Sequence, residues 1–164
     1  MATETAKLVV PVSERDHILG PEDAQVTLVE YGDLECPYCR QVNPVIQELR
    51  RRLGGRVRYV FRHFPIRSSH THAQLAAEAA EAAGAQGKFW EMHDRIFANQ
   101  RDLSAETLAG YAQEIGLDMD QFARDIEAED VKKRIDSDMQ QASKLGVTGT
   151  PSFFINGRYL SGAQ

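Results

Sequence analysis

Two cysteines three positions apart are the residues of this sequence best suited to chemistry. Cys36 and Cys39 are the only cysteines in the chain, and they enclose Pro37 and Tyr38. If these residues begin a helix, both thiols lie on one face and are close enough to form a disulfide. The Cys-Pro-Tyr-Cys segment therefore predicts a redox couple.

A helix that begins at Cys36 would also make its thiol acidic. With Cys36 as the N-cap, Pro37 occupies the first helical position, where a missing N–H has no consequence. The free N–H groups of Tyr38 and Cys39 and the positive end of the helix dipole then favour the Cys36 thiolate. Because the dipole contributes at most about 2 kcal/mol, hydrogen bonds to the sulfur must supply most of any large lowering of its pKa.

The length and charge of the chain limit its class. A chain of 164 residues can bury a sizeable core, and a formal net charge of -5 argues against a nucleic-acid partner. The early apolar run has neither the length of a membrane span nor the basic flank of a signal peptide. We therefore expect a cytoplasmic protein, or an extracytoplasmic one whose targeting segment lies outside this sequence.

The segments on either side of the cysteines predict a β-α-β unit. Residues 26–31 form an apolar run typical of a buried strand, which Glu30 interrupts. Between Cys36 and Leu53, apolar residues recur every third or fourth position, as on one face of a helix. Residues 56–64 alternate between apolar and charged side chains, so they predict a second strand, parallel to the first.

The remaining segments predict an N-terminal arm and a block of helices. Residues 7–12 are expected to form a short strand, followed by a polar loop in which His17 is a solvated residue rather than a ligand. Residues 69–146 predict four or five helices, with Ser104 and Asp118 as N-caps of two of them.

A hairpin is predicted near the end of the sequence. Asn156 and Gly157 form a tight-turn pair between two apolar segments. Pro151 opens the first of these segments, and we hypothesise that the Thr150-Pro151 bond is cis.

Four motifs in this order resemble the DsbA-like thiol-disulfide oxidoreductases. They are the Cys-Pro-Tyr-Cys segment, residues 61–65, residues 89–94 and residues 146–157. The resemblance implies an α/β thioredoxin-like fold with an all-helical insertion between the β-α-β unit and the C-terminal β-hairpin. It implies two domains: a discontinuous thioredoxin-like domain of residues 1–68 and 147–164, without the family's final helix, and an inserted helical domain of residues 69–146.

The resemblance also implies roles for individual residues. Cys36 would be the sulfur that exchanges with substrate and Cys39 its buried resolving partner, while Thr150 and Pro151 would bind an extended substrate. Glu30, six positions before Cys36, matches the buried acid that this fold keeps beneath the second cysteine. A carboxylate there can relay the proton that Cys39 gains or loses. The alternative for Glu30 is an exposed strand residue.

The function implied by the resemblance is disulfide exchange with protein thiols or disulfides, through a mixed disulfide at Cys36. It requires a redox partner and no cofactor. The dipeptide of Pro37 and Tyr38 is also typical of glutaredoxins, so glutathione-dependent reduction is an alternative. The direction of electron flow stays open, because a disulfide-forming protein and a cytoplasmic location do not agree.

A non-enzymatic metal-binding or chaperone module is the remaining alternative. Zinc bound by Cys36 and Cys39 would need further ligands, which only histidines would supply. The spacing of the histidines from the cysteines does not mark them as ligands, so no metal site is predicted; the histidines considered are His63, His70, His72 and His93.

Overall fold

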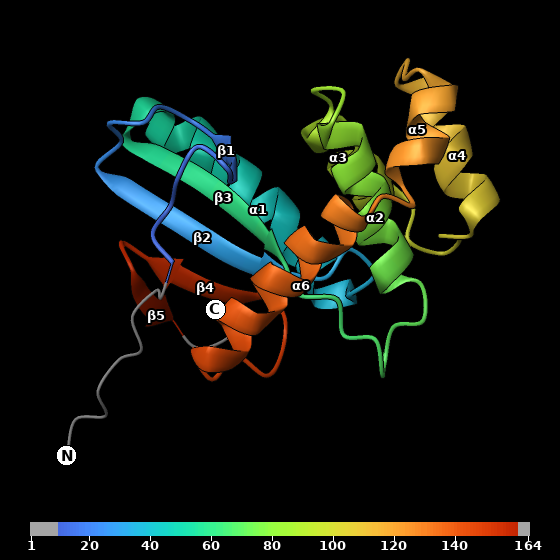
Figure 1. The fold of residues 1–164 in the computed structure, drawn as a ribbon. Helices are drawn as coiled ribbons and strands as arrows, with labels where there is room; N and C mark the ends of the chain where they lie inside the picture. The colour runs from blue at the N-terminus through green and yellow to red at the C-terminus, as the bar shows by residue number, and fades with distance from the viewer. Residues whose placement is uncertain (1–9, 161–164) are drawn as a thin grey trace.

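The computed structural model describes residues 10–160, and its strands form one five-stranded sheet (Figure 1). The order of strands across the sheet is β1-β3-β2-β4-β5. The central pair, β2 and β3, is parallel, and the other neighbours are antiparallel. The strands are β1 His17–Leu19, β2 Val26–Gly32, β3 Val57–His63, β4 Ser152–Ile155 and β5 Arg158–Leu160.

The β-α-β unit predicted from the sequence is confirmed. Helix α1, Pro37–Leu53, connects β2 to β3, followed by the short helical turn η1, Gly54–Arg56. A positive φ at Gly54, +54°, ends α1. Because β2 and β3 are parallel, Glu30 lies opposite Phe61 and Gly32 opposite His63 at the carboxyl ends of the strands.

Five helices separate β3 from β4, as the sequence predicted. The side chains of Ser104 and Asp118 accept hydrogen bonds from the first turns of α4 and α5, which confirms both as N-caps. Within residues 10–160, no helix is both long and apolar enough to cross a membrane. The helices are α2 Ala73–Gly84, α3 Phe89–Ala98, α4 Ala105–Glu114, α5 Met119–Asp125 and α6 Glu129–Lys144.

Each face of the sheet packs against different helices. On one face Tyr59 and Phe61 belong to a core that includes both cysteines and the aromatic residues of α3. On the other face Tyr31 and Phe154 pack against Ala142 of α6, which crosses that face in Figure 1. The expected division into two domains stays a prediction, since buried residues of α2 to α5 belong to the same core as α1.

The structure corrects the prediction for His17. It lies in β1, opposite Phe61, and is half-buried rather than solvated. Its ring stacks on Phe89 with centroids 3.6 Å apart. The polar side chains that suggested a loop have partners inside the protein. Asp16 pairs with Arg62 of β3, and His17 pairs with Glu81 of α2. Of the strand expected over residues 7–12, residues 7–9 lie outside the described residues and 10–12 are not in a strand.

Candidate active site

The two cysteines lie where β2 passes into α1. Cys36 is the N-cap of α1, with φ -71° and ψ 125°, and Pro37 is the first helical residue, as predicted. Both cysteines are thiols and both are buried, with exposed fractions of 3% for Cys36 and 1% for Cys39. Tyr38 between them is 65% exposed. The turn therefore holds both sulfurs at the end of the sheet and leaves Tyr38 at the surface.

The Cys36 thiol is much more acidic than an ordinary cysteine. A hydrogen bond with the side chain of Cys39 is the largest cause that lowers the pKa of Cys36, and burial opposes it. Thr150 and the backbone N–H groups of Cys39 and Tyr38 lower the pKa further, from an ordinary value of 9.0 to about 5. Hydrogen bonds do dominate the shift, but the main donor is the partner thiol rather than the helix backbone.

Cys39 has the opposite character. Burial, followed by the hydrogen bond to Cys36 and the charge of Glu30, raises the pKa of the Cys39 thiol far above its usual range. The backbone N–H of Asp33, 3.5 Å from the Cys39 sulfur, opposes this only in part. At neutral pH the reduced site therefore holds one thiolate, on Cys36, and one thiol, on Cys39.

This asymmetry predicts the titration of the reduced protein. Cys36 should ionise near pH 5, while Cys39 should stay protonated above pH 9, because hydrogen bonding favours the first thiolate and burial penalises the second. The thiolate absorbance in the ultraviolet and the rate of alkylation, both followed against pH, measure this. The oxidised protein, which has no thiol, is the control. A single step near pH 9 would contradict the assignment.

Glu30 is buried beneath the cysteines. Its exposed fraction is 1%, so the alternative of an exposed strand residue is wrong. The hydroxyl of Tyr59 donates to Glu30 Oε1 at 2.6 Å, and within residues 10–160 no hydrogen-bond partner reaches Oε2. Burial raises the pKa of Glu30 to about 7, against the lowering effect of the Tyr59 hydrogen bond. A carboxyl with this pKa can both take and give a proton near neutral pH.

A glycine in β2 makes room for this carboxyl. A Cβ at Gly32 would lie 2.6 Å from Glu30 Oε2 and 2.4 Å from the ring of Phe61. Any larger residue at this position would therefore displace the Glu30 carboxyl or the Phe61 ring. Glycine inside this strand is explained by the close packing around it. This glycine is the one signal in the sequence that would have pointed to a close approach at this position.

Thr150 and Pro151 lie beside Cys36. The Thr150-Pro151 peptide bond is cis. The Cys36 thiol donates to the carbonyl oxygen of Thr150 at 3.6 Å. The Ser152 hydroxyl donates to the carbonyl of Gly149 at 2.7 Å. The structure thus brings together all the residues that the sequence singled out for this site, across 114 positions between Cys36 and Thr150.

Two further contacts around the cysteines were missed by the sequence analysis. Gln100 Nε2 donates to the backbone oxygens of Leu34 at 2.8 Å and Cys36 at 3.1 Å. The buried carboxylate of Asp33 lies 2.6 Å from His70 Nδ1. Gln100 follows α3 and His70 precedes α2, so no local pattern could have linked either residue to the turn.

Replacing Gln100 with alanine should destabilise this turn. The change removes the Gln100 donor from the Leu34 carbonyl and leaves the Cys36 carbonyl only the N–H of Arg40. We expect a loss of about 1–3 kcal/mol in the free energy of unfolding. Gln100→Glu, which keeps the size but removes the donor, should lose at least as much. Chemical denaturation measures both, with the exposed Gln113→Ala as the matched control. Equal stability of the Gln100 and Gln113 variants would contradict the role of these hydrogen bonds.

Comparison with known proteins defines the class. A family model described as "Thioredoxin" matches residues 12–164. A thioredoxin-like oxidoreductase from Silicibacter pomeroyi DSS-3 is 35% identical, with a TM-score of 0.82 over 92% of this chain and 85% of that one. The thiol-disulfide exchange protein alpha-DsbA2 from Wolbachia pipientis is 26% identical, with a TM-score of 0.82 over 92% and 81% of the two chains. Fold and site together define a thiol-disulfide oxidoreductase of the DsbA/thioredoxin type. Within that class, the chain belongs to the thioredoxin family.

Several curated relatives are much longer than this chain. The Na(+)/H(+) antiporter NhaA 1 of Salinispora arenicola is 49% identical over 157 residues, which are 95% of this chain and 24% of that protein. The Na(+)/H(+) antiporter NhaA of Herminiimonas arsenicoxydans is 46% identical over 150 residues, 92% of this chain and 24% of that protein. The chain therefore spans about a quarter of the length of these relatives.

The cysteines do not join a cluster of metal-ligand residues. Within residues 10–160, the group of His, Cys, Asp and Glu side chains whose ligand atoms come together is His17, His63 and Glu81. It contains neither Cys36 nor Cys39. The alternative of zinc held by the two cysteines and a histidine therefore has no ligand set in the part of the chain that the structure describes.

Proposed function

We propose that this chain exchanges disulfides with protein substrates through a mixed disulfide at Cys36. The observation that carries the proposal is the opposite pKa shift of two neighbouring thiols, with Cys36 lowered to about 5 and Cys39 raised. An attacking or leaving sulfur must be a stable thiolate, and a resolving thiol must stay protonated until it is needed. Cys36 and Cys39 meet these two requirements.

In the oxidising direction, a substrate thiolate attacks Cys36 Sγ of the Cys36-Cys39 disulfide. The disulfide bond breaks, Cys39 leaves with its electron pair, and it takes up a proton. A second substrate thiolate then attacks the substrate sulfur of the mixed disulfide and expels the Cys36 thiolate. The substrate loses two electrons and the protein gains them. The reducing direction is the reverse of these steps.

Glu30 is proposed as the group that gives Cys39 its proton and removes it again. Burial raises the pKa of Glu30 to about 7, which suits proton transfer in either direction. The charge of Glu30 also raises the pKa of Cys39, so the two groups influence each other's protonation. Thr150 and Pro151 are proposed to bind the substrate backbone, because they border the sulfur that exchanges.

The equilibrium reduction potential of the cysteine pair tests the proposal. It is measured against defined glutathione buffers, by trapping the thiols at each ratio. A value of about -120 to -180 mV would indicate an oxidant or isomerase, and a value near about -270 mV a reductant. A pair that does not cycle between thiol and disulfide at any ratio would overturn the proposal.

Glutathione-dependent reduction is the second candidate, favoured by the glutaredoxin-type Pro37 and the exposed Tyr38 beside Cys36. Rates with a glutathionylated peptide and with a disulfide-bonded unfolded protein distinguish the two functions. Faster turnover of the glutathionylated peptide would favour the second candidate. Faster turnover of the protein disulfide would favour the first.

The compartment is likewise a proposal. A cytoplasmic location agrees with a reductant, and an extracytoplasmic one with an oxidant, because disulfides persist only outside the reducing cytosol. The measured potential therefore bears on the location as well. The proposal concerns the thioredoxin-like chain and leaves aside the ion exchange named for its longer relatives.

A further inference from the structure

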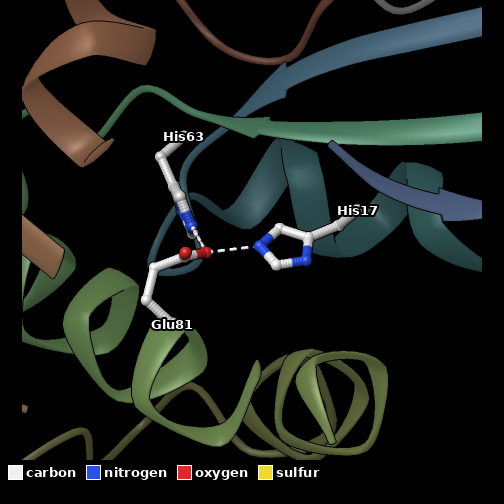
Figure 2. A group of neighbouring side chains, drawn as sticks. All are labelled: His17, His63 and Glu81. Carbon is white, nitrogen blue, oxygen red and sulfur yellow. Dashed lines mark hydrogen bonds and ion pairs between the residues drawn. The ribbon is translucent and has the colours of Figure 1, made fainter. Parts of the chain in front are cut away.

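Three side chains outside the proposed active site converge on one point. His17 comes from β1, His63 from the end of β3 and Glu81 from α2, and Figure 2 shows both imidazoles directed at the carboxylate. His17 Nε2 lies 2.5 Å and His63 Nε2 2.8 Å from the same oxygen, Glu81 Oε2. One ligand atom of each residue lies within 4.8 Å of the other two.

We propose that His17, His63 and Glu81 bind a divalent transition-metal ion, with Zn²⁺ the best match to their chemistry. Two imidazole nitrogens and one carboxylate oxygen form the ligand set of zinc sites that keep one coordination position open. Hard ions such as Mg²⁺ prefer sites made of oxygen alone. The proposed site shares no residue with the cysteine site and does not depend on the function proposed for it.

A cavity gives the cluster access and space. A cavity of about 800 Å³ lies between β1, α2 and α6, and His17 and Glu81 form part of its wall. An ion can reach the cluster from this side, and a water molecule can occupy the open coordination position. His63 and Glu81 are buried, so the ligands are held by the packing of three elements rather than by a surface loop.

The two arginines near the cluster pair with atoms other than the proposed coordinating oxygen, Glu81 Oε2. Arg134 of α6 lies with Nε 2.9 Å from the other carboxylate oxygen, Glu81 Oε1, as an ion pair without the alignment of a hydrogen bond. It therefore holds the carboxylate oxygen that the imidazoles do not contact, and so helps to orient Glu81. Arg62 is held by Asp16, with Nε 2.8 Å from Oδ1 and Nη2 3.0 Å from Oδ2.

A further acid supports the position of His63. Asp138 of α6 accepts a hydrogen bond from the backbone N–H of His63 at 2.9 Å. This contact fixes the end of β3 against α6, where the imidazole turns toward Glu81. It also adds a carboxyl group to a cavity wall that carries Arg62 and Arg134 together with Asp16 and Glu81.

The proposal is tested by measuring metal-ion binding to a variant that lacks the two active-site thiols. Cys36→Ser and Cys39→Ser together remove the two thiols, which would otherwise be zinc ligands. Titration with Co²⁺ should produce visible absorption bands that saturate at one ion per chain, and Zn²⁺ should displace them. Binding should also release protons, since the ligands must be unprotonated. No saturable binding of either ion would overturn the proposal.

Single variants of this chain locate the site. His17→Gln, at the half-buried edge of the cluster, should weaken Zn²⁺ affinity by roughly 100-fold or more. His72→Gln is the matched control, because His72 is an exposed histidine that also pairs with a glutamate, Glu35. In the background without the two thiols, Zn²⁺ should raise the melting temperature of the protein with no further change and of the His72→Gln control, but not of His17→Gln. Equal affinity of the two variants would overturn the site.

X-ray absorption of the Zn²⁺-loaded protein that carries only Cys36→Ser and Cys39→Ser keeps the proposal testable if a histidine variant fails to fold. The expected spectrum shows nitrogen and oxygen ligands, with the outer-shell scattering of two imidazoles. A zinc ion with one imidazole or none would overturn the assignment.

Discussion

Cys36→Ser is expected to reduce disulfide exchange to the rate of the uncatalysed reaction. Every proposed step forms or breaks a bond at the Cys36 sulfur, and a serine hydroxyl at this position is neither a thiolate at neutral pH nor able to form a disulfide. The low pKa of Cys36, about 5, also makes it the better leaving group of the two cysteines. Turnover of a disulfide-bonded protein substrate with an excess of reductant measures the loss.

Cys39→Ser should behave differently, although it also removes a sulfur. Cys36 stays free to react, but the resolving thiol is gone, so complexes linked through Cys36 should accumulate. Non-reducing gels and mass spectrometry would detect them. Tyr38→Phe, at an exposed position between the cysteines, is the control and should retain exchange. Full activity of Cys36→Ser, or mixed disulfides formed through Cys39 instead, would contradict the mechanism.

Glu30→Gln is expected to slow the release of a mixed disulfide by about 10²-fold or more, the usual contribution of a positioned acid or base. Cys39 must lose its proton before it attacks the mixed disulfide, and burial raises the pKa of Cys39 far above neutral. Glutamine has the shape of glutamate but cannot accept this proton. The rate at which a preformed mixed disulfide at Cys36 decays to the Cys36-Cys39 disulfide measures the effect.

The pH profile of mixed-disulfide release distinguishes a role of Glu30 in proton transfer from a role in packing alone. The base is the Glu30 carboxylate, so the rate should rise with pH through an inflection near the pKa of Glu30, about 7. The inflection should lie slightly below that value, because Cys36 in a mixed disulfide lacks the negative charge that raises the pKa of Glu30.

Tyr59→Phe provides the matched control for this profile. It removes the hydrogen bond that lowers the pKa of Glu30, so the inflection should move to higher pH while the maximum rate is retained. In Glu30→Gln the inflection should disappear. The same inflection in Glu30→Gln as in the parent would mean that another group transfers the proton.

The local parts of the fold were predictable because short-range patterns determine them. The helix start at Cys36 and Pro37 follows from capping chemistry that needs only adjacent residues. The apolar spacing of residues 26–31 and 56–64 determined the two parallel strands. The turn at Asn156, with φ +48°, and Gly157, with φ +84°, adopts the backbone conformation that these two residue types favour. The roles of Glu30 and Thr150 came from a resemblance and were not deduced from spacing.

Burial and long-range contacts decided the rest, and no local pattern reports them. The sequence by itself determined a redox pair at a helix start, but the tertiary structure decided that the thiol of Cys39 is the main group that lowers the pKa of Cys36. It also placed Gln100 on the backbone of the turn and brought His17 to Glu81, 64 positions away. From the sequence alone, a charged residue in a polar segment is expected to be exposed to solvent. Whether it meets a partner inside the protein depends on how the sheet and helices pack, because only packing removes water and supplies the opposite charge.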